Sequence, residues 1–221
     1  RSEAFEHLQH AAEGVVSLLA ARICKRYARP TESPNSQPAL RILSDAPLRH
    51  PALFGYLASR GIVPGIAAAY CREVRYQVRN HCFFAIGFRN DCGGWELRSE
   101  RFKGSSSPKQ ITTVDHQSDK VIVFEGFMDF LSYLTLKQAG DDTVCVGGPC
   151  DYLVMNSVNN LKKALVHLQE YPIIHCYLDN DLAGRKTAET IAGMYDEFVC
   201  NEALRYGEYK DLNDYLRGKR L

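Results

Sequence analysis

The stretch YLDNDLAGRKTAE, residues 177–189, decides the fold because it places two aspartates where a buried strand meets a helix. The apolar run 173–178 predicts a short strand, and the residues from Ala183 onward predict a helix. Side chains alternate along an extended chain, so Asp179 and Asp181 point to the same side. Two neighbouring carboxylates repel each other unless a proton or a cation lies between them. The plainer alternative is that Asp181 caps the helix and Asp179 is solvated.

The chain around this stretch alternates between strands and helices from residue 120 onward. Nearly continuous apolar runs predict strands at 120–125, 143–147, 172–179 and 198–204, and amphipathic segments predict helices near 127–138, 156–168 and 182–195. This alternation is typical of a parallel sheet with helices on both faces. Ligands of such sheets bind at the carboxyl ends of the strands, where Asp179 and Asp181 are expected to lie.

Further acidic residues are expected at the same edge of the sheet. Glu125 ends the first of these strands, and Gly126 is expected to permit a sharp turn into the next helix. Asp211 and Asp214 follow the last strand, whereas Asp129 falls in a first helical turn, where the helix dipole alone favours a carboxylate. Converging carboxylates predict a site for Mg²⁺ or Mn²⁺, because such hard cations prefer oxygen ligands. Two such ions can serve phosphoryl transfer.

The upstream part of the chain has a different pattern. An amphipathic helix of about 25 residues is predicted at the N-terminus, followed by a proline-rich linker at 29–39. Helical segments are predicted at 50–61, with Gly61 as the C-cap, and at 63–74. Strands at 81–90 and 94–102 are predicted to flank a turn, and 103–110 is expected to be a loop. We therefore expect an N-terminal helix and linker at 1–45, a smaller α+β subdomain at 46–118 and an α/β domain at 119–221.

The net charge of +1 hides an asymmetry between the two halves. Residues 121–216 contain 15 acidic and 7 basic residues, a net charge of −8, whereas residues 1–120 carry +6. A basic hairpin beside a Gly/Ser loop is positioned to contact phosphates of nucleic acid or nucleotide. Its basic residues are Arg98, Arg101, Lys103 and Lys109. Trp95 and Phe102 are candidates for stacking on bases, and the alternative is an ordinary solvated hairpin.

Composition and cysteine placement narrow the class of protein. Apolar residues make up 45% of the chain and charged residues 24%, as in ordinary globular proteins. No apolar run approaches the roughly 18 residues that a membrane span needs, and no signal peptide is visible, so no membrane partner is expected. The eight cysteines are scattered without a C-x-x-C pair. This predicts reduced thiols, a cytoplasmic protein and no structural zinc site.

Two motifs together resemble the Toprim domain, which bacterial replicative (DnaG-type) primases share with topoisomerases and some nucleases. VIVFEGFMD (121–129) and YLDNDLAGRKTAE are most similar to the primase versions, in which a hydrophobic strand ends in Glu-Gly-x-x-Asp and a later one in Asp-x-Asp-x-Ala-Gly-Arg. YLASRGI (56–62) and the hairpin are more loosely similar to segments that precede the primase sheet. Primases usually have Asp-Pro-Asp in the last acidic loop, where this chain has Asp211-Leu212-Asn213. The arrangement also resembles primase-like Toprim proteins of mobile elements.

The resemblance implies an α/β fold, with a Toprim-type parallel sheet flanked by helices and preceded by a smaller α+β subdomain. It implies a nucleotidyltransferase that synthesises RNA primers on single-stranded DNA from nucleoside triphosphates with Mg²⁺ or Mn²⁺. Glu125, Asp129, Asp179, Asp181 and Asp211 fall on its acidic positions, with Asp179, Asp181 and Asp211 as metal ligands and Glu125 as a ligand or an acid–base group.

The expected partners include a helicase or another replication or mobilisation protein. Two alternatives remain open. A Toprim nuclease would use the same metals for hydrolysis, and a non-catalytic nucleic-acid-binding module would keep the basic hairpin. The upstream segments favour the primase, and the complete acidic set argues against the non-catalytic module.

Overall fold

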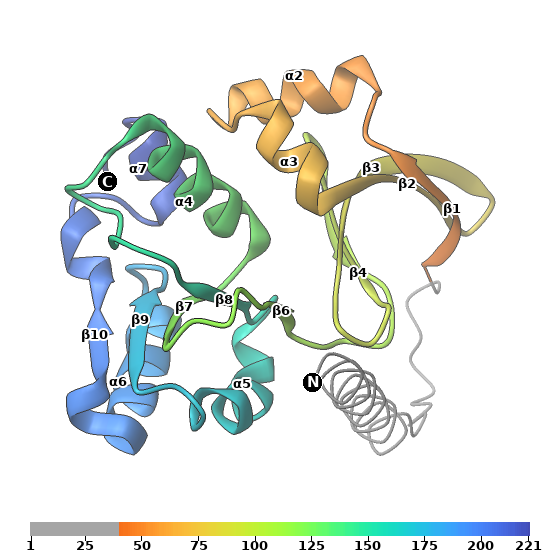
Figure 1. The fold of residues 1–221 in the computed structure, drawn as a ribbon. Coiled ribbons are helices and arrows are strands. Elements are labelled where there is room, and N and C mark those ends of the chain that lie inside the picture. Colours follow the sequence, from red (N-terminus) through yellow and green to blue (C-terminus); the bar gives the residue numbers. More distant parts are fainter. Residues whose placement is uncertain (1–39) are drawn as a thin grey trace, which may run out of the picture. The chain divides into compact units, whose positions relative to one another are not determined.

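The computed structural model describes residues 40–221, so the predicted N-terminal helix and the proline-rich segment lie outside the described residues. The described part contains two five-stranded sheets (Figure 1). The first sheet has the order β1-β2-β3-β4-β5, and the second has the order β10-β9-β7-β8-β6. The mixed α/β class expected from the sequence is confirmed.

The first sheet is antiparallel throughout. The predicted hairpin is confirmed, because two strands flank the turn at residues 91–94 and pair with each other. Gly61 ends a helix with φ +70°, a left-handed conformation that glycine adopts readily. The strands of the first sheet are β1 (Arg41–Pro47), β2 (Cys71–Val78), β3 (His81–Arg89), β4 (Trp95–Ser99) and β5 (Phe102–Ser105). Helices α2 (Pro51–Ser59) and α3 (Pro64–Tyr70) lie between β1 and β2 in the chain.

Three details of this half differ from the predictions. The helix predicted at 63–74 ends at Tyr70, and β2 begins at Cys71, because buried Val74 and Tyr76 alternate with exposed charged residues as strand residues do. The segment predicted as a loop at 103–110 begins with strand residues of β5. Strand β1 has no counterpart among the predicted elements, since its residues are mostly exposed and show no hydrophobic alternation.

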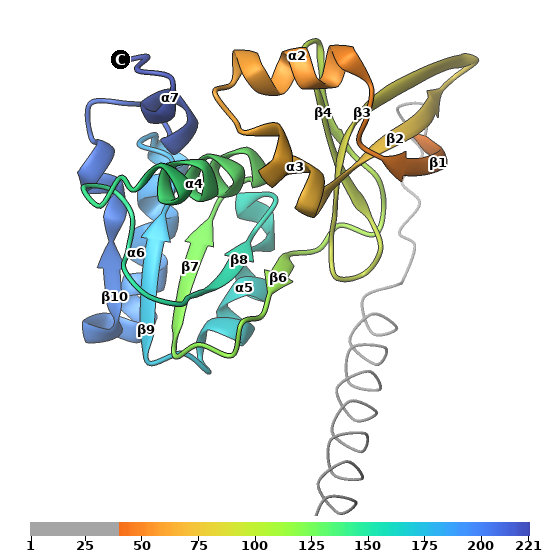
Figure 2. The same cartoon turned by 45° about the horizontal axis from the view of Figure 1, so that its top comes forward.

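The second sheet has four parallel strands and one antiparallel edge strand. Helix α4 covers one face, and α5 and α6 cover the other (Figure 2). The elements are β6 (Thr112–Val114), β7 (Lys120–Phe124), α4 (Phe127–Ala139), β8 (Asp151–Val154), η1 (Val158–Asn160), α5 (Leu161–Leu168), β9 (Ile173–Tyr177), α6 (Leu182–Tyr195), η2 (Asp196–Phe198), β10 (Val199–Asn201), η3 (Glu202–Tyr206) and α7 (Leu212–Leu216).

The strand predicted at 143–147 is wrong, because this segment is a loop and the strand beside β7 is β8. Val144 and Cys145 are buried in the core although they belong to no strand, and the Val144 carbonyl accepts a hydrogen bond from the Tyr177 hydroxyl. A short apolar run shows burial more reliably than it shows strand conformation. The last predicted strand, 198–204, is likewise shorter, since η3 begins at Glu202.

Strand β7 is buried on both faces and belongs to two hydrophobic clusters. Ile122 and Phe124 join the cluster that contains residues of α2, β3 and α4, so the two sheets share one core. Val121 and Val123 face the opposite cluster, under α5 and α6. This alternation explains why the strand reads as a continuous apolar run in the sequence. It also fixes the position of Glu125, the residue that follows the strand.

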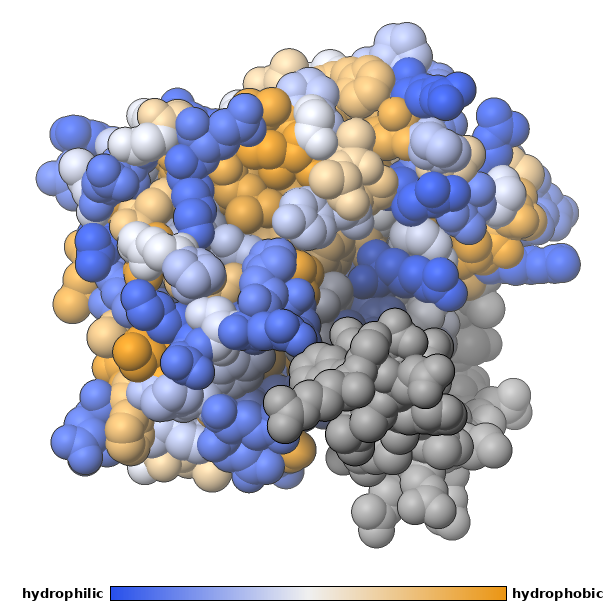
Figure 3. Space-filling view, in the orientation of Figure 1, coloured by the Kyte–Doolittle hydropathy of each residue, from blue (hydrophilic) through white to orange (hydrophobic). Residues whose placement is uncertain are grey.

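Within residues 40–221, no single helix is long and apolar enough to cross a membrane, although α2 and α3 pass this test as a pair bent by 114°. Hydrophilic side chains cover much of the face seen in Figure 3, and hydrophobic ones gather near α4. Six of the described cysteines have free thiols.

Candidate active site

The site is built at the carboxyl ends of β7 and β9. These strands are parallel neighbours in which Phe124 pairs with Tyr177, so Glu125 and Asp179 follow them at the same edge of the sheet. Gly184 lets the first turn of α6 pack on the backbone after β9, since a Cβ there would lie 2.1 Å from the Asp179 carbonyl oxygen. The chain bends at Glu125 and Gly126 before α4 begins, as expected, but Gly126 has φ −136°, which any residue can adopt, so the bend does not require glycine there.

Asn180, between the two aspartates of the motif, holds a distant segment against this edge. Its backbone N–H donates to the Lys210 carbonyl at 2.7 Å, and its side-chain amide donates to the Tyr206 and Tyr209 carbonyls at 3.1 and 2.9 Å. Asp211 follows Lys210 directly, so these hydrogen bonds bring its carboxylate to the same site. The outward-pointing residue of the Asp-x-Asp motif therefore positions a third acidic segment.

One pocket, with a volume of about 480 Å³, brings most of the expected site residues together. Four of its lining residues are carboxylates from segments that flank the second sheet, and the β4–β5 hairpin contributes three cations and one exposed carboxylate, Glu100. The carboxylates are Glu125, Asp129, Asp179 and Asp211, and the cations are Arg98, Arg101 and Lys103. Lys109 lines an adjoining hollow that also contains Arg98 and Lys103.

The carboxylates of the pocket are short of compensating partners. Burial raises the pKa of Glu125, as do the charges of Asp181 and Asp211, and the Oε2 atom of Glu125 is buried without a hydrogen-bond partner. Burial and the neighbouring carboxylates Glu125 and Asp211 raise the pKa of Asp179 to about 7. The pKa of Asp129 lies well above its usual range for the same reasons, with burial first. A buried, unpartnered carboxylate oxygen among other carboxylates fits a divalent cation with oxygen ligands.

Asp181 and Asp211 have a second, structural role. Asp181 caps α6, since its Oδ1 accepts hydrogen bonds from the backbone N–H groups of Ala183 and Gly184, both at 2.9 Å. Asp211 caps α7 through the N–H of Asp214 at 2.7 Å. Each cap uses Oδ1 alone, and Oδ2 has no hydrogen bond among the described residues. Capping and metal binding are therefore compatible at these positions.

Two of the expected acidic residues lie apart from the pocket lining. Asp181 affects Glu125 and Asp179 by its charge without lining the pocket. Asp214 forms an ion pair with Arg217 at 3.3 Å and does not line the pocket. The structure therefore brings five of the six acidic candidates to one region and turns Asp214 away.

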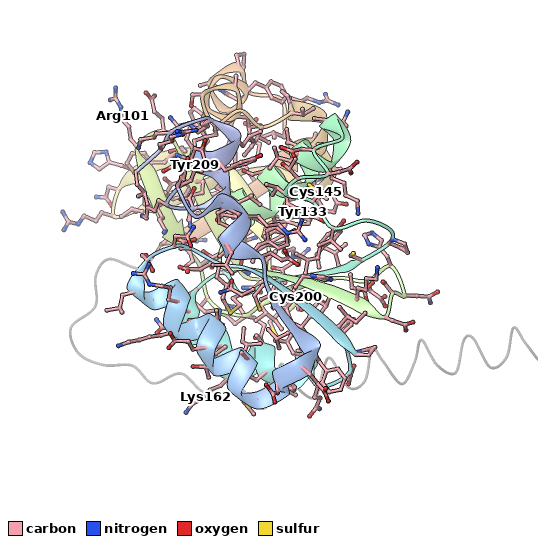
Figure 4. The ribbon with its side chains drawn as sticks, turned by 90° about the vertical axis from the view of Figure 1, so that its left-hand side faces the viewer. Arg101, Tyr133, Cys145, Lys162, Cys200 and Tyr209 are labelled. Atoms are coloured by element: carbon pink, nitrogen blue, oxygen red, sulfur yellow. The ribbon has the colours of Figure 1, made fainter. Side chains whose placement is uncertain are left out.

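The basic wall of the pocket comes from register in the β4–β5 hairpin. Arg98 pairs with Lys103, so both side chains lie on the face toward the pocket. The Arg98 guanidinium lies 5.5 Å from the Phe127 ring centroid, and burial lowers its pKa while the charge of Glu96 opposes that shift. Arg101 is exposed and extends outward from the hairpin (Figure 4).

The two aromatic residues expected to stack on bases differ in accessibility. Trp95 is only 7% exposed and belongs to the core of the first sheet, so its predicted contact with bases is wrong. An alternating strand pattern with a single tryptophan does not show which face is buried. Phe102 is partly buried and stacks on Tyr76, with ring centroids 4.9 Å apart.

Sequence reasoning missed several residues that line the pocket, and four of them are polar residues outside the hairpin. Tyr56 and Arg60 come from the segment YLASRGI, whose resemblance to primases was the available signal, and Lys210 precedes Asp211. Asn156 follows β8 at the same sheet edge and has a buried Oδ1 without a partner. It was missed because the strand before it was placed elsewhere in the chain.

Asn213 explains how the chain departs from the usual primase pattern. Its side-chain amide donates to the Arg60 carbonyl and to the Ser132 hydroxyl, both at 2.8 Å, and the residue is fully buried. The position therefore links α7 to α2 and α4. A carboxylate there would face a carbonyl oxygen, so asparagine suits this packing better.

Comparison with known families agrees with this arrangement. Residues 122–216 match the model of the family described as Toprim-like, and residues 42–107 match a domain of unknown function (DUF8464). The second sheet with its acidic edge is thus a Toprim-like domain, as its motifs predict. None of the curated protein sequences compared matches the chain.

Solved structures of primases have a similar fold. The crystal structure of the primase fragment of the bacteriophage T7 primase-helicase protein is 17% identical, with a TM-score of 0.52, and the match covers 86% of this chain and 80% of that chain. The crystal structure of the Aquifex aeolicus primase (zinc binding and RNA polymerase domains) is 12% identical, with a TM-score of 0.50, covering 90% of this chain and 56% of that one. The chain therefore has a primase-like fold with a Toprim-like domain.

Proposed function

We propose that this protein is a primase-like nucleotidyltransferase that joins ribonucleotides on a single-stranded DNA template. The observation that supports this function best is the pocket itself, in which carboxylates of the Toprim-like sheet face cations of the antiparallel sheet. Polymerisation needs both sets, because it must bind anionic nucleotides and stabilise the charge of phosphoryl transfer.

Mg²⁺ or Mn²⁺ would be held by Asp179, Asp211 and Glu125, with the Oδ2 atom of Asp181 available beside them. When bound, such ions stabilise the charge on the attacking and leaving oxygens. The carboxylates of this site lie at the edge of a sheet buried on both faces, which favours a fixed geometry.

The remaining residues bind and orient the reactants. Arg98 and Lys103 would contact the triphosphate of the incoming nucleotide, because they share the face toward the carboxylates. Arg101 and Lys109 are exposed and would contact template phosphates. Glu125 would bind metal through its unpartnered Oε2 or accept the proton of the attacking hydroxyl, for which a raised pKa is favourable.

A primer-synthesis assay tests this proposal directly. The chain is incubated with single-stranded DNA, labelled ribonucleotides and Mn²⁺, and the same reaction contains end-labelled DNA that reports cleavage. We expect ribonucleotide products that disappear in Asp179→Asn and in the absence of divalent metal. Metal-dependent cleavage without synthesis would instead support the Toprim nuclease, and DNA binding without either product would support the non-catalytic module.

Interaction with a helicase or another replication or mobilisation protein and a cytoplasmic location remain predictions from the resemblance and the composition. A mobile-element origin also remains a prediction from the resemblance. The primer-synthesis assay does not depend on the partner, the location or the origin of the protein.

A further inference from the structure

We propose that His175, Cys200 and Glu202 form a second metal site, distinct from the carboxylate pocket, that takes Zn²⁺. Strands β9 and β10 are parallel neighbours in which Cys200 pairs directly with His175. Residues paired in this way point to the same face of a sheet. Glu202 is the first residue of η3, and its Oε1 atom lies 2.7 Å from Nδ1 of His175. The ligand atoms of the three side chains all lie within 4.8 Å of one another.

The donor set selects the metal. An imidazole nitrogen, a thiolate and a carboxylate oxygen are all common zinc ligands, with Zn–S near 2.3 Å and Zn–N near 2.0 Å. Mg²⁺ prefers oxygen ligands and has little affinity for thiolate. Three protein ligands also leave one tetrahedral position for water. The site is therefore suited to a different ion from the one expected in the carboxylate pocket.

The present contacts show how an ion would enter. The Nδ1 atom of His175 lies 2.7 Å from Oε1 of Glu202, and Oε2 of the same carboxylate accepts a hydrogen bond from Arg205. Zinc would replace the proton between His175 and Glu202, and Arg205 would keep Glu202 oriented through Oε2. Binding forms Zn–N, Zn–S and Zn–O bonds and releases the thiol proton of Cys200 to water. The proton between Nδ1 and Glu202 moves to Nε2 of the same ring, or passes to water where Nε2 already carries one.

Access to the site is open from solvent through Cys200. This residue is exposed on β10, the edge strand of the sheet, and Figure 4 marks its position. His175 and Glu202 are both buried, at 9% and 6% exposure, so their ring and carboxylate are held in place. An ion approaching from solvent would meet the sulfur atom of Cys200 first and two fixed ligands behind it.

The site lies between the two segments that carry the candidate catalytic carboxylates. Three residues separate His175 from Asp179 along β9 and the turn after it, and η3, which begins at Glu202, leads to Asp211. A bound zinc ion would link β9 to the start of η3, in addition to the hydrogen bonds by which Asn180 already holds residues 206–210. Its role would be to position the sheet edge and to stabilise the fold, without contact with substrate.

Cobalt provides the spectroscopic test, because Co²⁺ substitutes for Zn²⁺ and thiolate ligation gives it a near-ultraviolet charge-transfer band. Co²⁺ is titrated into the whole chain in the presence of a non-coordinating reductant. We expect one equivalent to produce the band, Zn²⁺ to abolish it, and Cys200→Ser to remove it with at least a tenfold loss of affinity. Cys82→Ser, which removes another exposed free thiol, is the matched control and should keep the band.

Two further measurements separate this site from the carboxylate pocket. Asp179→Asn should keep the cobalt band, because oxygen ligands do not produce it. Zn²⁺ should raise the melting temperature of the parent protein and of Cys82→Ser, but not of Cys200→Ser, since a ligand that binds only the folded state stabilises it. A parent protein without the thiolate band, or a Cys200→Ser variant with an undiminished band, would overturn the proposal.

Discussion

The two sheets of this protein contribute opposite charges to one pocket, and they do so in different ways. The carboxylates lie at the edge of a buried parallel sheet, have raised pKa values and, at Glu125, lack a partner. Three of the four basic residues of the hairpin segment are exposed: Arg101 in the turn, Lys103 on β5 and Lys109 in the loop that follows. A single substitution at the acidic edge should therefore be enough to abolish most of the activity. Substitutions in the hairpin should weaken DNA binding by an amount that grows with each charge removed and becomes smaller at high salt.

The sharpest test of this difference is Glu125→Gln. The substitution keeps the shape of the side chain but removes a charge that metal binding or proton transfer requires, so primer synthesis should fall by about 100-fold or more. Binding to single-stranded DNA should survive, because the hairpin is unchanged. Glu170→Gln, at an exposed position, is the control and should be silent. A Glu125→Gln protein that extends primers at the parental rate would exclude this mechanism.

The hairpin should behave as a set of additive interactions with phosphate groups. Replacing Arg101, Lys103 and Lys109 together with alanine should weaken binding to single-stranded DNA. It should also reduce the dependence of log K on log salt by about 0.7 for each phosphate that is no longer neutralised. Titrations at four salt concentrations measure this slope. Arg98→Ala is made separately, because its guanidinium also packs against Phe127 and its removal would affect stability.

The matched control for the hairpin uses two cations elsewhere on the chain. Lys162→Ala with Lys186→Ala removes positive charges from α5 and α6, outside the residues that line the pocket. If the triple hairpin variant has the same slope as this control, the hairpin is an ordinary solvated one.

The acidic half of the comparison was largely predictable from the sequence, and the reason is physical. A strand buried on both faces must be apolar throughout, so β7 and β9 are visible as runs that end at Glu125 and Asp179. Their parallel arrangement follows from the helices between them. The loop at residues 143–147 imitates such a strand because its valine and cysteine are buried without pairing. For the same reason Asn156, at the end of the true strand β8, escaped prediction.

The contacts between distant segments were beyond sequence reasoning. Tyr56 and Arg60 reach the pocket from α2 because the two sheets share one hydrophobic cluster. The pairing of His175 with Cys200 depends on strand register, which no spacing rule for zinc ligands describes. Trp95 was assigned to the wrong face for a similar reason, since alternation shows two faces but not which one is covered.

Asp179→Asn tests whether the acidic residues repel one another when no metal is present. The variant should bind Mn²⁺ more weakly by calorimetric titration. Because the pKa of Asp179 is raised to about 7, metal-free parent protein is stabilised by this group below pH 4 and loses that contribution as the pH rises through 7. Asparagine has no such dependence. The metal-free variant should thus melt at a higher temperature than the parent at pH 8, and unchanged Mn²⁺ affinity would contradict the metal assignment.

The smallest expected effect concerns Glu96, a buried carboxylate on the basic side of the comparison. It lies on β4, is 7% exposed, and lines the hollow that also contains Lys103 and Lys109. Burial raises its pKa to about 7, although Arg98, Lys109 and Lys103 act in the opposite direction. A group whose pKa is raised by folding stabilises the protein when protonated. That contribution is complete below about pH 4.5 and is lost as the pH rises through 7.

Glu96→Gln should therefore gain stability relative to the parent protein between pH 5 and pH 8, by about 1–2 kcal/mol, since one unit of pKa corresponds to about 1.4 kcal/mol. Urea unfolding at both pH values measures this gain, with Glu100→Gln, an exposed neighbour, as the control.

The comparison between the sheets adds a second expectation. In the variant that lacks Arg101, Lys103 and Lys109, Arg98 is the one remaining cation of those that lower the pKa of Glu96. The pKa of Glu96 should therefore rise further, and the protein should lose the corresponding stability at a higher pH. If the stability difference between Glu96→Gln and the parent is the same at pH 5 and pH 8, the hairpin cations already hold this carboxylate ionised, and the basic wall is stronger than its exposure indicates.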